Sequence, residues 1–191
     1  RAVLHNQDFI NEKRISIGDK IIVRKAGDII PEVVSVSYHN EDSPIYQIPN
    51  ICPSCGSNVV KSDVEAAIRC TNIKCPAQLL RNIIHFASRD AMDIEGLGSA
   101  IAEVLVNKKL ISSPADLYYL KAEDISSIER MGEKSAANLI NAIEKSKSND
   151  LSKLIFALGI RNIGQKAAAL LAQRFNNMNA VISADLQAIC T

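Results

Sequence analysis

The stretch CPSCGSNVVKSDVEAAIRCTNIKC, residues 52–75, decides the fold, because it holds four of the five cysteines. Cys52 and Cys55 form one close pair, Cys70 and Cys75 form another, and a loop of 14 residues separates the pairs. This spacing lets four thiolates surround one tetrahedral ion. Zn²⁺ held by four thiolates at about 2.3 Å has no open coordination position, so the predicted site is structural. The ion would stabilise a segment too short to form its own core.

Other interpretations of the cysteines are weaker. A CxxC redox pair belongs beside a βαβ pattern, which the sequence does not show. Two disulfides need an oxidising compartment, and the sequence has neither a signal peptide nor an apolar run of membrane-spanning length. His39 and His85 are expected to be structural or incidental, because four thiolates need no histidine.

Composition limits the function classes. A length of 191 residues allows one large domain or two to three small ones, and a hydrophobic content of 47% is enough for real cores. Aromatic residues make up only 4%, so base stacking is not expected as the main mode of nucleic-acid recognition. The net charge of +1 neither indicates nor excludes a polyanionic partner.

The N-terminal segment is predicted to be rich in β-structure. Residues 19–25 (DKIIVRK) and 32–38 (EVVSVSY) are β-branched runs separated by a turn at 26–28. Further short strands are expected near Val3 and Tyr46. Four strands are too few to close a barrel, so the sheet is open or is part of a barrel.

The fold class predicted for the chain is multidomain α+β. We expect a partial, OB-like β-barrel over residues 1–48, a small zinc finger over 49–76 and an all-α region over 77–191. Helical periodicity begins at Pro76, which suits a first helical turn.

The α-helical region contains a repeat. Residues 94–98 (IEGLG), 128–132 (IERMG) and 160–164 (IRNIG) share two apolar positions and a final glycine, and each glycine precedes a helix rich in small residues. The glycines are 34 and 32 residues apart. A fourth copy is expected to open at 186–189 and to be truncated in this chain.

The repeat predicts a surface for nucleic-acid phosphates. Glycine before a helix lets the backbone approach a partner, and the first helical N–H groups point outward without internal acceptors. We expect Gly98, Gly132 and Gly164 to present such amides to the minor-groove side of a duplex. Lys134 and Lys166, two residues after their glycines, add a cation. Such contacts recognise backbone shape rather than base sequence.

The third copy lies in an acid-free stretch. Residues 151–184 contain no Asp or Glu but include Lys153, Arg161, Lys166 and Arg174, which favours a polyanion. A single glycine of this kind would be interpreted as an ordinary helix cap, but three copies at near-constant spacing favour binding.

The three hairpins resemble helix-hairpin-helix elements, which bind duplex DNA without sequence preference. The first copy matches best, because Gly96 and Gly98 are both present. Arg130 and Asn162 occupy the position of Gly96 in the other copies, and Arg130 is expected to reach a phosphate itself.

The order of these modules resembles the C-terminal part of bacterial NAD-dependent DNA ligases over residues 1–191. Each module alone is common, whereas the ordered set is specific. The matching strings are AVLHN at 2–6, IGDK at 17–20, RKAGDIIP at 24–31, CPSCG at 52–56, MDIEGLG at 92–98 and ALGIR at 157–161.

The resemblance implies that this chain holds double-stranded nicked DNA, independently of sequence, for phosphodiester sealing in replication and repair. Arg1, Arg24 and Lys25 of the barrel would lie near the nick. The family transfers AMP from NAD through a lysine to the 5′-phosphate, with Mg²⁺ assisting, and the 3′-hydroxyl then displaces it. That lysine is expected upstream, so this chain would contain no catalytic residue and be inactive alone. It would be a monomer in the bacterial cytoplasm with no membrane partner.

Two alternatives remain open. The chain could be the helix-hairpin-helix and zinc module of another DNA repair or junction-binding protein, which would prefer branched to nicked duplex. It could also be a protein-interaction scaffold, for which changing Gly98, Gly132 and Gly164 to valine would leave any DNA affinity untouched.

Overall fold

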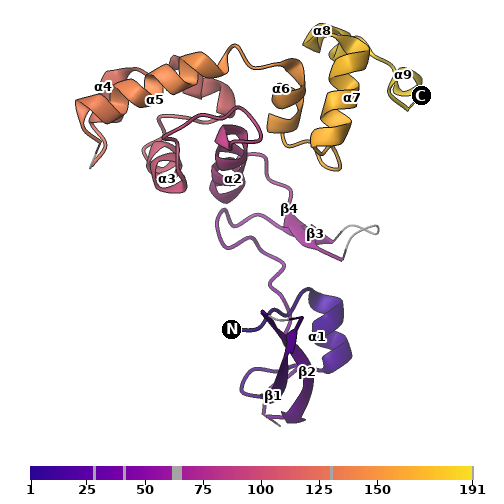
Figure 1. Cartoon of the computed structure of the whole chain (residues 1–191). Helices are drawn as coiled ribbons and strands as arrows, with labels where there is room; N and C mark the ends of the chain where they lie inside the picture. The colour runs from indigo at the N-terminus through magenta and orange to yellow at the C-terminus, as the bar shows by residue number, and fades with distance from the viewer. Residues whose placement is uncertain (28, 41, 62–65, 130, 191) are drawn as a thin grey trace. The chain divides into compact units, whose positions relative to one another are not determined.

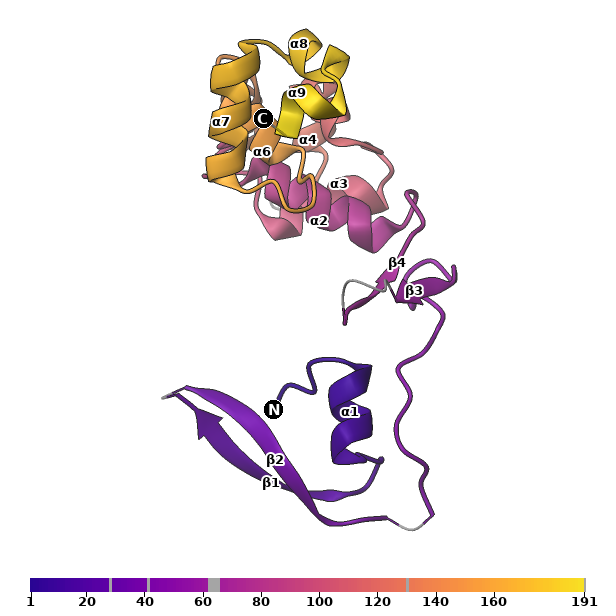
Figure 2. The ribbon, with the colours of Figure 1, turned by 90° about the vertical axis from the view of Figure 1, so that its right-hand side faces the viewer.

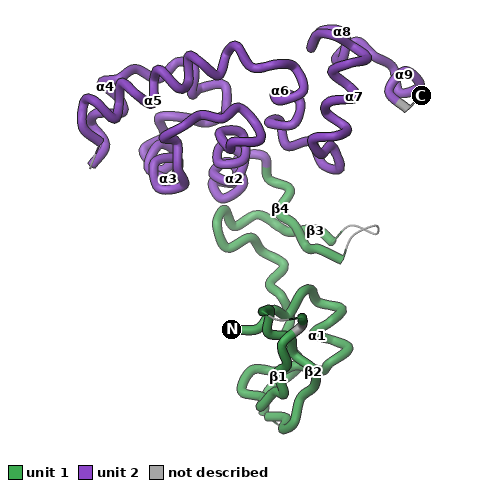
Figure 3. The backbone as a smooth tube through the Cα atoms, in the orientation of Figure 1, with its two compact units in different colours: residues 1–72 green, residues 73–191 purple. Residues whose placement is uncertain are grey.

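The computed structural model describes residues 1–27, 29–40, 42–61, 66–129 and 131–190. The chain divides into two compact units, Arg1–Asn72 and Ile73–Thr191 (Figure 3). The described part of the first unit contains one helix and two small antiparallel sheets, and the described part of the second is helical (Figures 1 and 2). The combination of strands, a cysteine cluster and tandem hairpins confirms the predicted α+β class. The predicted domain boundaries after residues 48 and 76 stay predictions.

The first unit begins with α1 (Gln7–Lys13), followed by the antiparallel strands β1 (Lys20–Ala26) and β2 (Ile30–Tyr38). The two strands are those that the β-branched runs predict. Gly27 between them has a φ of +61°, a conformation that favours glycine in a tight turn. Asp28 of the predicted turn lies outside the described residues.

The expectation of further strands near Val3 and Tyr46 is wrong in extent. Val3 forms only an isolated bridge with Glu32, and the neighbour of Tyr46, Ile45, forms one with Ser16. Here the side chain of Gln7 forms the backbone hydrogen bonds that a neighbouring strand would otherwise form. Gln7 donates from Nε2 to the carbonyl of Tyr46 at 3.0 Å and accepts at Oε1 from the N–H of Ile48 at 2.7 Å.

A small apolar cluster holds this part together. Ile10 from α1, Val33 from β2 and Ile15 from the connection between α1 and β1 are buried at its centre. With three buried members among the residues that the structure describes, the cluster is too small to stabilise a domain by itself.

The second sheet of the first unit is the hairpin of β3 (Val59–Lys61) and β4 (Ile68–Cys70). It lies between the two cysteine pairs in the sequence. Its Lys61 ammonium lies 2.7 and 2.8 Å from the two carboxylate oxygens of Asp8 in α1, an exposed pair that contributes about 1 kcal/mol at most.

The second unit is built from paired helices. The pairs α2 with α3, α4 with α5 and α6 with α7 each pack together, as the three repeats predict. The elements are α2 (Pro76–Ala87), α3 (Ser99–Asn107), the 3₁₀ helix η1 (Pro114–Tyr119), α4 (Ala122–Ser126), α5 (Glu133–Ser146), α6 (Leu151–Ala157), α7 (Gln165–Phe175), α8 (Met178–Ser183) and α9 (Leu186–Cys190).

The apolar core of this unit is unevenly distributed. Its buried members extend from Ile83 in α2 to Ala157 at the end of α6. Beyond them, α7 contributes one buried residue among those described, Ala168, and its Leu170 is 67% exposed. Among the described residues, the third helix pair therefore has fewer buried apolar residues than either of the first two. No described helix has both the length and the apolar character required to cross a bilayer.

Candidate metal centre and nucleic-acid interface

The four predicted metal ligands converge in the structure. The Sγ atoms of Cys52, Cys55, Cys70 and Cys75 all lie within 4.8 Å of one another, and none forms a disulfide. Four thiolates at about 2.3 Å from a tetrahedral zinc ion lie about 3.8 Å apart. The donor set therefore fits Zn²⁺ in type, number and spacing.

Local backbone geometry explains how the first cysteine pair forms. The N–H of Gly56 donates to the carbonyl of Cys52 at 2.9 Å, and the N–H of Cys52 donates to the carbonyl of Ser57 at 2.8 Å. Gly56 has a φ of +71°, which glycine adopts without strain. The Asn72 side-chain amide donates to the Ser57 hydroxyl at 3.0 Å and so connects this turn to the second pair.

The thiols of Cys55 and Cys70 affect each other's pKa. Their Sγ atoms lie 3.5 Å apart. Hydrogen bonds from the side chain and backbone of Ser57 lower the pKa of Cys55 to about 6. The backbone N–H of Asn72 lowers the pKa of Cys70, but burial and the neighbouring thiols outweigh it and raise that pKa to about 11. Without a metal, the Cys55 thiol therefore loses its proton more readily than the Cys70 thiol, and a bound cation would favour the thiolate form of its ligands.

The fourth ligand also begins a helix. Cys75 is the N-cap of α2 and is 1% exposed. Pro76 follows at the first helical position, where its missing N–H has no consequence. Cys75 is therefore both a predicted metal ligand and the residue at which α2 begins.

The three repeats form the same turn. In each, the N–H of the fourth residue donates to the carbonyl of the first, so the apolar positions of the repeat close the hairpin. The donor and acceptor pairs are Leu97 with Ile94 at 3.2 Å, Met131 with Ile128 at 3.0 Å, and Ile163 with Ile160 at 3.0 Å. We call residues 94–98, 128–132 and 160–164 the first, second and third corners.

Each corner ends in a glycine that caps a helix. Gly98, Gly132 and Gly164 are exposed N-caps of α3, α5 and α7, with φ between −83° and −76° and no side-chain cap. The first intrahelical bonds come from the residues four positions later, at 2.9 to 3.0 Å. The three preceding amides of each helix therefore have no acceptor within the helix. The predicted geometry of these glycines is present in all three copies.

The residue two positions before each glycine differs between corners. Gly96 has a φ of +88° and Asn162 has a φ of +66°, so asparagine adopts the left-handed conformation that glycine adopts in the first corner. Sequence reasoning missed this equivalence, although asparagine tolerates that region better than most residues. Arg130, the predicted phosphate contact at this position of the second corner, lies outside the described residues.

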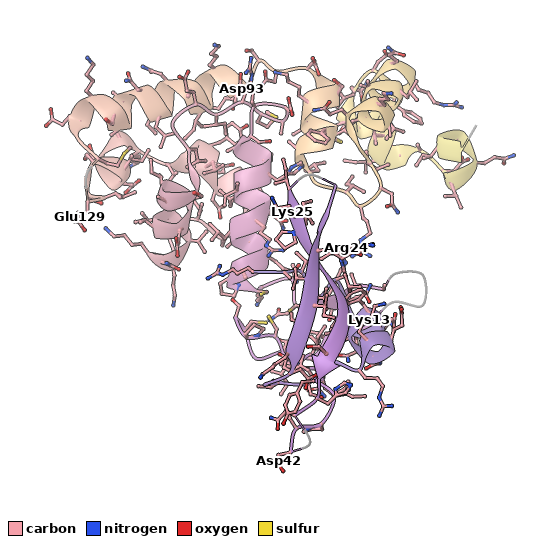
Figure 4. All side chains as sticks on the ribbon, turned by 60° about the horizontal axis from the view of Figure 1, so that its bottom comes forward. Lys13, Arg24, Lys25, Asp42, Asp93 and Glu129 are labelled. Atoms are coloured by element: carbon pink, nitrogen blue, oxygen red, sulfur yellow. The ribbon has the colours of Figure 1, made fainter. Side chains whose placement is uncertain are left out.

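The corners have the same backbone conformation but carry different charged residues. Lys134 and Lys166 are exposed at equivalent positions of α5 and α7, where α3 has Ala100. Arg161 is exposed in the third corner, whereas Glu95 is exposed in the first and Asp93 precedes it (Figure 4). The first corner is therefore acidic and the third is basic.

The predicted barrel residues lie in the first unit. Arg1, Arg24 and Lys25 are exposed, the last two near the end of β1 (Figure 4). Arg24 Nε lies 3.1 Å from Glu32 Oε2, so its charge is partly balanced within the sheet. His39 also has a local role, because its Nδ1 lies 3.3 Å from the Asp19 carboxylate.

Comparison with known proteins gives matches along most of the chain. Residues 1–44 match the model of the NAD-dependent DNA ligase OB-fold domain, and residues 52–77 match that of the NAD-dependent DNA ligase C4 zinc finger domain. Residues 88–145 match a SAM-like helix-hairpin-helix tandem, and residues 153–191 match a helix-hairpin-helix motif.

Whole-chain relatives agree with these domain matches. The chain is 54% identical over 186 residues to a DNA ligase of Pelotomaculum thermopropionicum, covering 96% of this chain and 27% of that protein. It is 54% identical over 193 residues to a DNA ligase of Acetivibrio thermocellus, covering 99% and 29%. It is 53% identical over 186 residues to a DNA ligase of Clostridioides difficile, covering 96% and 28%. The chain thus spans less than a third of the length of these curated relatives.

Proposed function

Because the chain belongs to the NAD-dependent DNA ligase family, we propose that it is a DNA-binding part of such an enzyme and holds nicked duplex DNA for sealing. The duplex is gripped through its phosphates, independently of base sequence. The Zn²⁺ ion of the cysteine cluster acts structurally, since four thiolates leave it no position for a substrate.

One observation carries the proposal. A Cβ atom built on Gly98, Gly132 or Gly164 would meet nothing within 4 Å, and their φ values suit any residue. Serine, threonine, aspartate and asparagine stabilise an N-cap more than glycine does. The fold itself therefore does not need glycine at these three sites. A molecule that approaches the bare backbone does need it, and a phosphate matches the outward amides.

Charged side chains supplement these amides in the proposal. Lys134 and Lys166, with Arg130 and Arg161 in the preceding turns, supply cations to nearby phosphates. Gly96 allows the first corner to approach closely. Arg1, Arg24 and Lys25 of the barrel contact the duplex around the nick; their support is the family resemblance and their exposure.

The chemical steps are proposed to lie elsewhere in the parent protein. In this proposal NAD, Mg²⁺ and the lysine that carries AMP act outside the 191 residues, so this chain alone does not form an adenylate. It acts as a monomer in the bacterial cytoplasm. Incubation with NAD followed by mass spectrometry tests this, and an adenylated chain would refute the division of labour.

Binding is tested by replacing the three cap glycines with valine, whose side chain fills the open space beside the backbone. Gly98→Val, Gly132→Val and Gly164→Val are compared with Ala115→Val, a change at an exposed position of η1. We expect each glycine change to weaken binding to a nicked 30-base-pair duplex by about ten-fold, the size of one lost charge-assisted hydrogen bond. The control should bind as wild type. Melting temperatures should stay within a few degrees, since no atom is displaced.

The same assay separates the alternatives. Sequence-independent binding with a steep salt dependence is expected. A junction-binding module would prefer a four-way junction to the nicked duplex. An interaction scaffold would bind DNA equally well with and without the three valines, and either result would replace the proposal.

A further inference from the structure

His85 joins the first helix pair to the third. It lies in the last turn of α2 and is half-buried. Its Nε2 lies 2.8 Å from the carbonyl oxygen of Phe156 in α6, 71 residues further along the chain. A carbonyl oxygen can only accept, so Nε2 carries the hydrogen in this contact. The two rings also meet edge to face, with centroids 4.9 Å apart at 73°.

The hydrogen bond from His85 lies at the C-terminal end of α6. The last carbonyls of a helix have no partner within it, and a histidine donor at that end is favourable. The Phe156 carbonyl also accepts from the N–H of Gly159 at 3.0 Å. His85 thus helps to terminate α6 from outside, immediately before the third corner.

The imidazole ring is fitted against Gly159 as well. Gly159 has a φ of +64°, and a Cβ built on it would lie 3.2 Å from His85 Cδ2 and 3.7 Å from Nε2. Glycine is required here by the backbone conformation and by the ring. Gly159 directly precedes Ile160, the first residue of the third corner.

Apolar packing anchors the third corner less than the first. The first corner is anchored by Ile94 and Leu97, which are 3% and 6% exposed, whereas Ile160 of the third corner is 51% exposed. A second polar tie, from the Asn149 side-chain amide to the Met92 carbonyl at 2.7 Å, joins the segment before α6 to the loop before the first corner. It lies at the opposite end of α6 from Gly159.

We propose that His85 is a positioning residue that sets the third corner in register with the first two, so that all three engage one duplex. The inference rests on the proposed function. His85 itself touches no DNA; it acts through the Phe156 carbonyl and Gly159 on the amides and cations of residues 160–166. Its loss leaves a folded chain whose third corner no longer adds its share of the phosphate contacts.

Two substitutions separate the hydrogen bond from the packing. His85→Phe keeps a ring against Phe156 but has no donor, whereas His85→Gln keeps a donor with similar reach. His85→Leu, which also has no donor, is the second variant. It should speed amide exchange at Ile163 as His85→Phe does, so the test stays decisive if His85→Phe does not fold.

The first arm uses the whole 191-residue chain without DNA. Amide hydrogen exchange is compared at Ile163, whose N–H closes the third corner, and at Leu97, whose N–H closes the first. We expect His85→Phe to speed exchange at Ile163 about ten-fold and to leave Leu97 unchanged. His85→Gln should restore most of the protection at Ile163. Equal protection of Ile163 in wild type and His85→Phe would overturn the proposal.

The second arm measures coupling during binding to the nicked duplex. In wild type, Lys166→Ala should weaken binding about three- to ten-fold. In the His85→Phe background the same change should weaken it less than two-fold, because the corner is already out of register. Lys134→Ala in the second corner is the control and should lose the same factor in both backgrounds. An unchanged effect of Lys166→Ala would also overturn the proposal.

The two arms distinguish the possible failures. If wild type does not bind duplex DNA, the proposed function falls, and the exchange data still decide whether His85 orders the third corner. If wild type binds and the two lysine effects are independent of residue 85, the proposed function stands and the positioning role is refuted.

Discussion

The first and third corners have the same backbone conformation but differ in burial and in charge. Both close with the same turn hydrogen bond and end in an exposed N-cap glycine. In the first, Ile94 is 3% exposed, Glu95 is the charged neighbour and the lysine position holds an alanine; in the third, Ile160 is 51% exposed and Arg161 and Lys166 are present. Anchoring in the core and attraction for a polyanion are thus divided between copies of one motif.

The division of labour between corners has a physical basis. In the proposed function, a corner anchored in the core presents its amides in a fixed place, so it needs no cation to bind a phosphate. A corner with little apolar anchoring gains from long-range attraction and, in our proposal, depends on His85 to hold its geometry. The four predictions below test this contrast, from the largest expected effect to the smallest.

Removing the metal should have the largest effect and should leave the contrast intact. A chelator such as EDTA is expected to abolish the ordered structure of residues 52–61 and 66–75, because the binding energy of a structural zinc ion, on the order of 10 kcal/mol, is folding energy. The corners belong to a unit with its own apolar core, so their amide signals should persist. Heteronuclear NMR before and after chelation checks both parts. Loss of the corner signals would show that the corners depend on the metal.

Removing the lysine that follows the third corner, or adding one after the first, should change the affinity for duplex DNA. Lys166→Ala should weaken duplex binding about three- to ten-fold and reduce the salt slope by about 0.9. Ala100→Lys should strengthen binding by a similar factor and raise the slope. Fluorescence anisotropy between 50 and 200 mM salt measures both. If Ala100→Lys has no effect, the first corner does not face a phosphate.

Replacing the left-handed residues should distinguish strain from binding. Gly96→Ala should destabilise the chain by about 1–2 kcal/mol, because Gly96 has a φ of +88°. Asn162→Gly should change stability by only a few tenths, since glycine adopts the observed φ of +66° freely. Gly164→Ser is the matched control, with an ordinary φ, open space and a side chain that suits an N-cap. Urea unfolding gives all three values, and equal losses for Gly96→Ala and Gly164→Ser would contradict the assignment.

Acid should loosen the third hairpin before the first. The Ser152 hydroxyl, with the backbone N–H of Lys153, lowers the pKa of Asp150, the N-cap of α6. A depressed folded-state pKa means that the carboxylate stabilises α6 at neutral pH and that this contribution is lost as pH falls below about 4. α2 of the first hairpin has no acidic residue in its first turn.

Amide chemical shifts recorded from pH 6 to pH 3 test the acid effect. Those in the first turn of α6 should move and those in the first turn of α2 should stay. Asp150→Asn keeps a capping acceptor that does not titrate, so it should remove the change in α6. A transition that persists in Asp150→Asn would assign it to another carboxyl group.

Features encoded by local spacing were predictable from the sequence. The four metal ligands, the start of α2 at Pro76 and the three glycine corners all depend on residues a few positions apart. In contrast, α1 has seven residues and one buried member, Ile10, so its apolar periodicity is too short to detect. Its recognisable signal is the N-cap Asn6, which accepts from the N–H of Phe9 at 2.9 Å.

Features that depend on contacts between distant segments were not predictable. The sequence-based interpretation treated His85 as structural or incidental, and nothing near it in the sequence indicates a contact with Phe156, 71 residues away. The side chain of Gln7 bonds to the backbone of Tyr46 and Ile48 in place of a strand, and no local pattern specifies such a substitute. Periodicity identifies which face of an element is buried, but it does not identify the partner.

The empty space above the three cap glycines has an evolutionary consequence. A mutation there leaves a chain that folds, accumulates and passes any screen for solubility or thermal resistance, since no neighbouring atom is displaced. Selection for growth would remove the same mutation if the parent enzyme must grip its substrate. A saturation library scored under both selections would therefore give opposite results at these codons and matching results at buried positions such as Leu105.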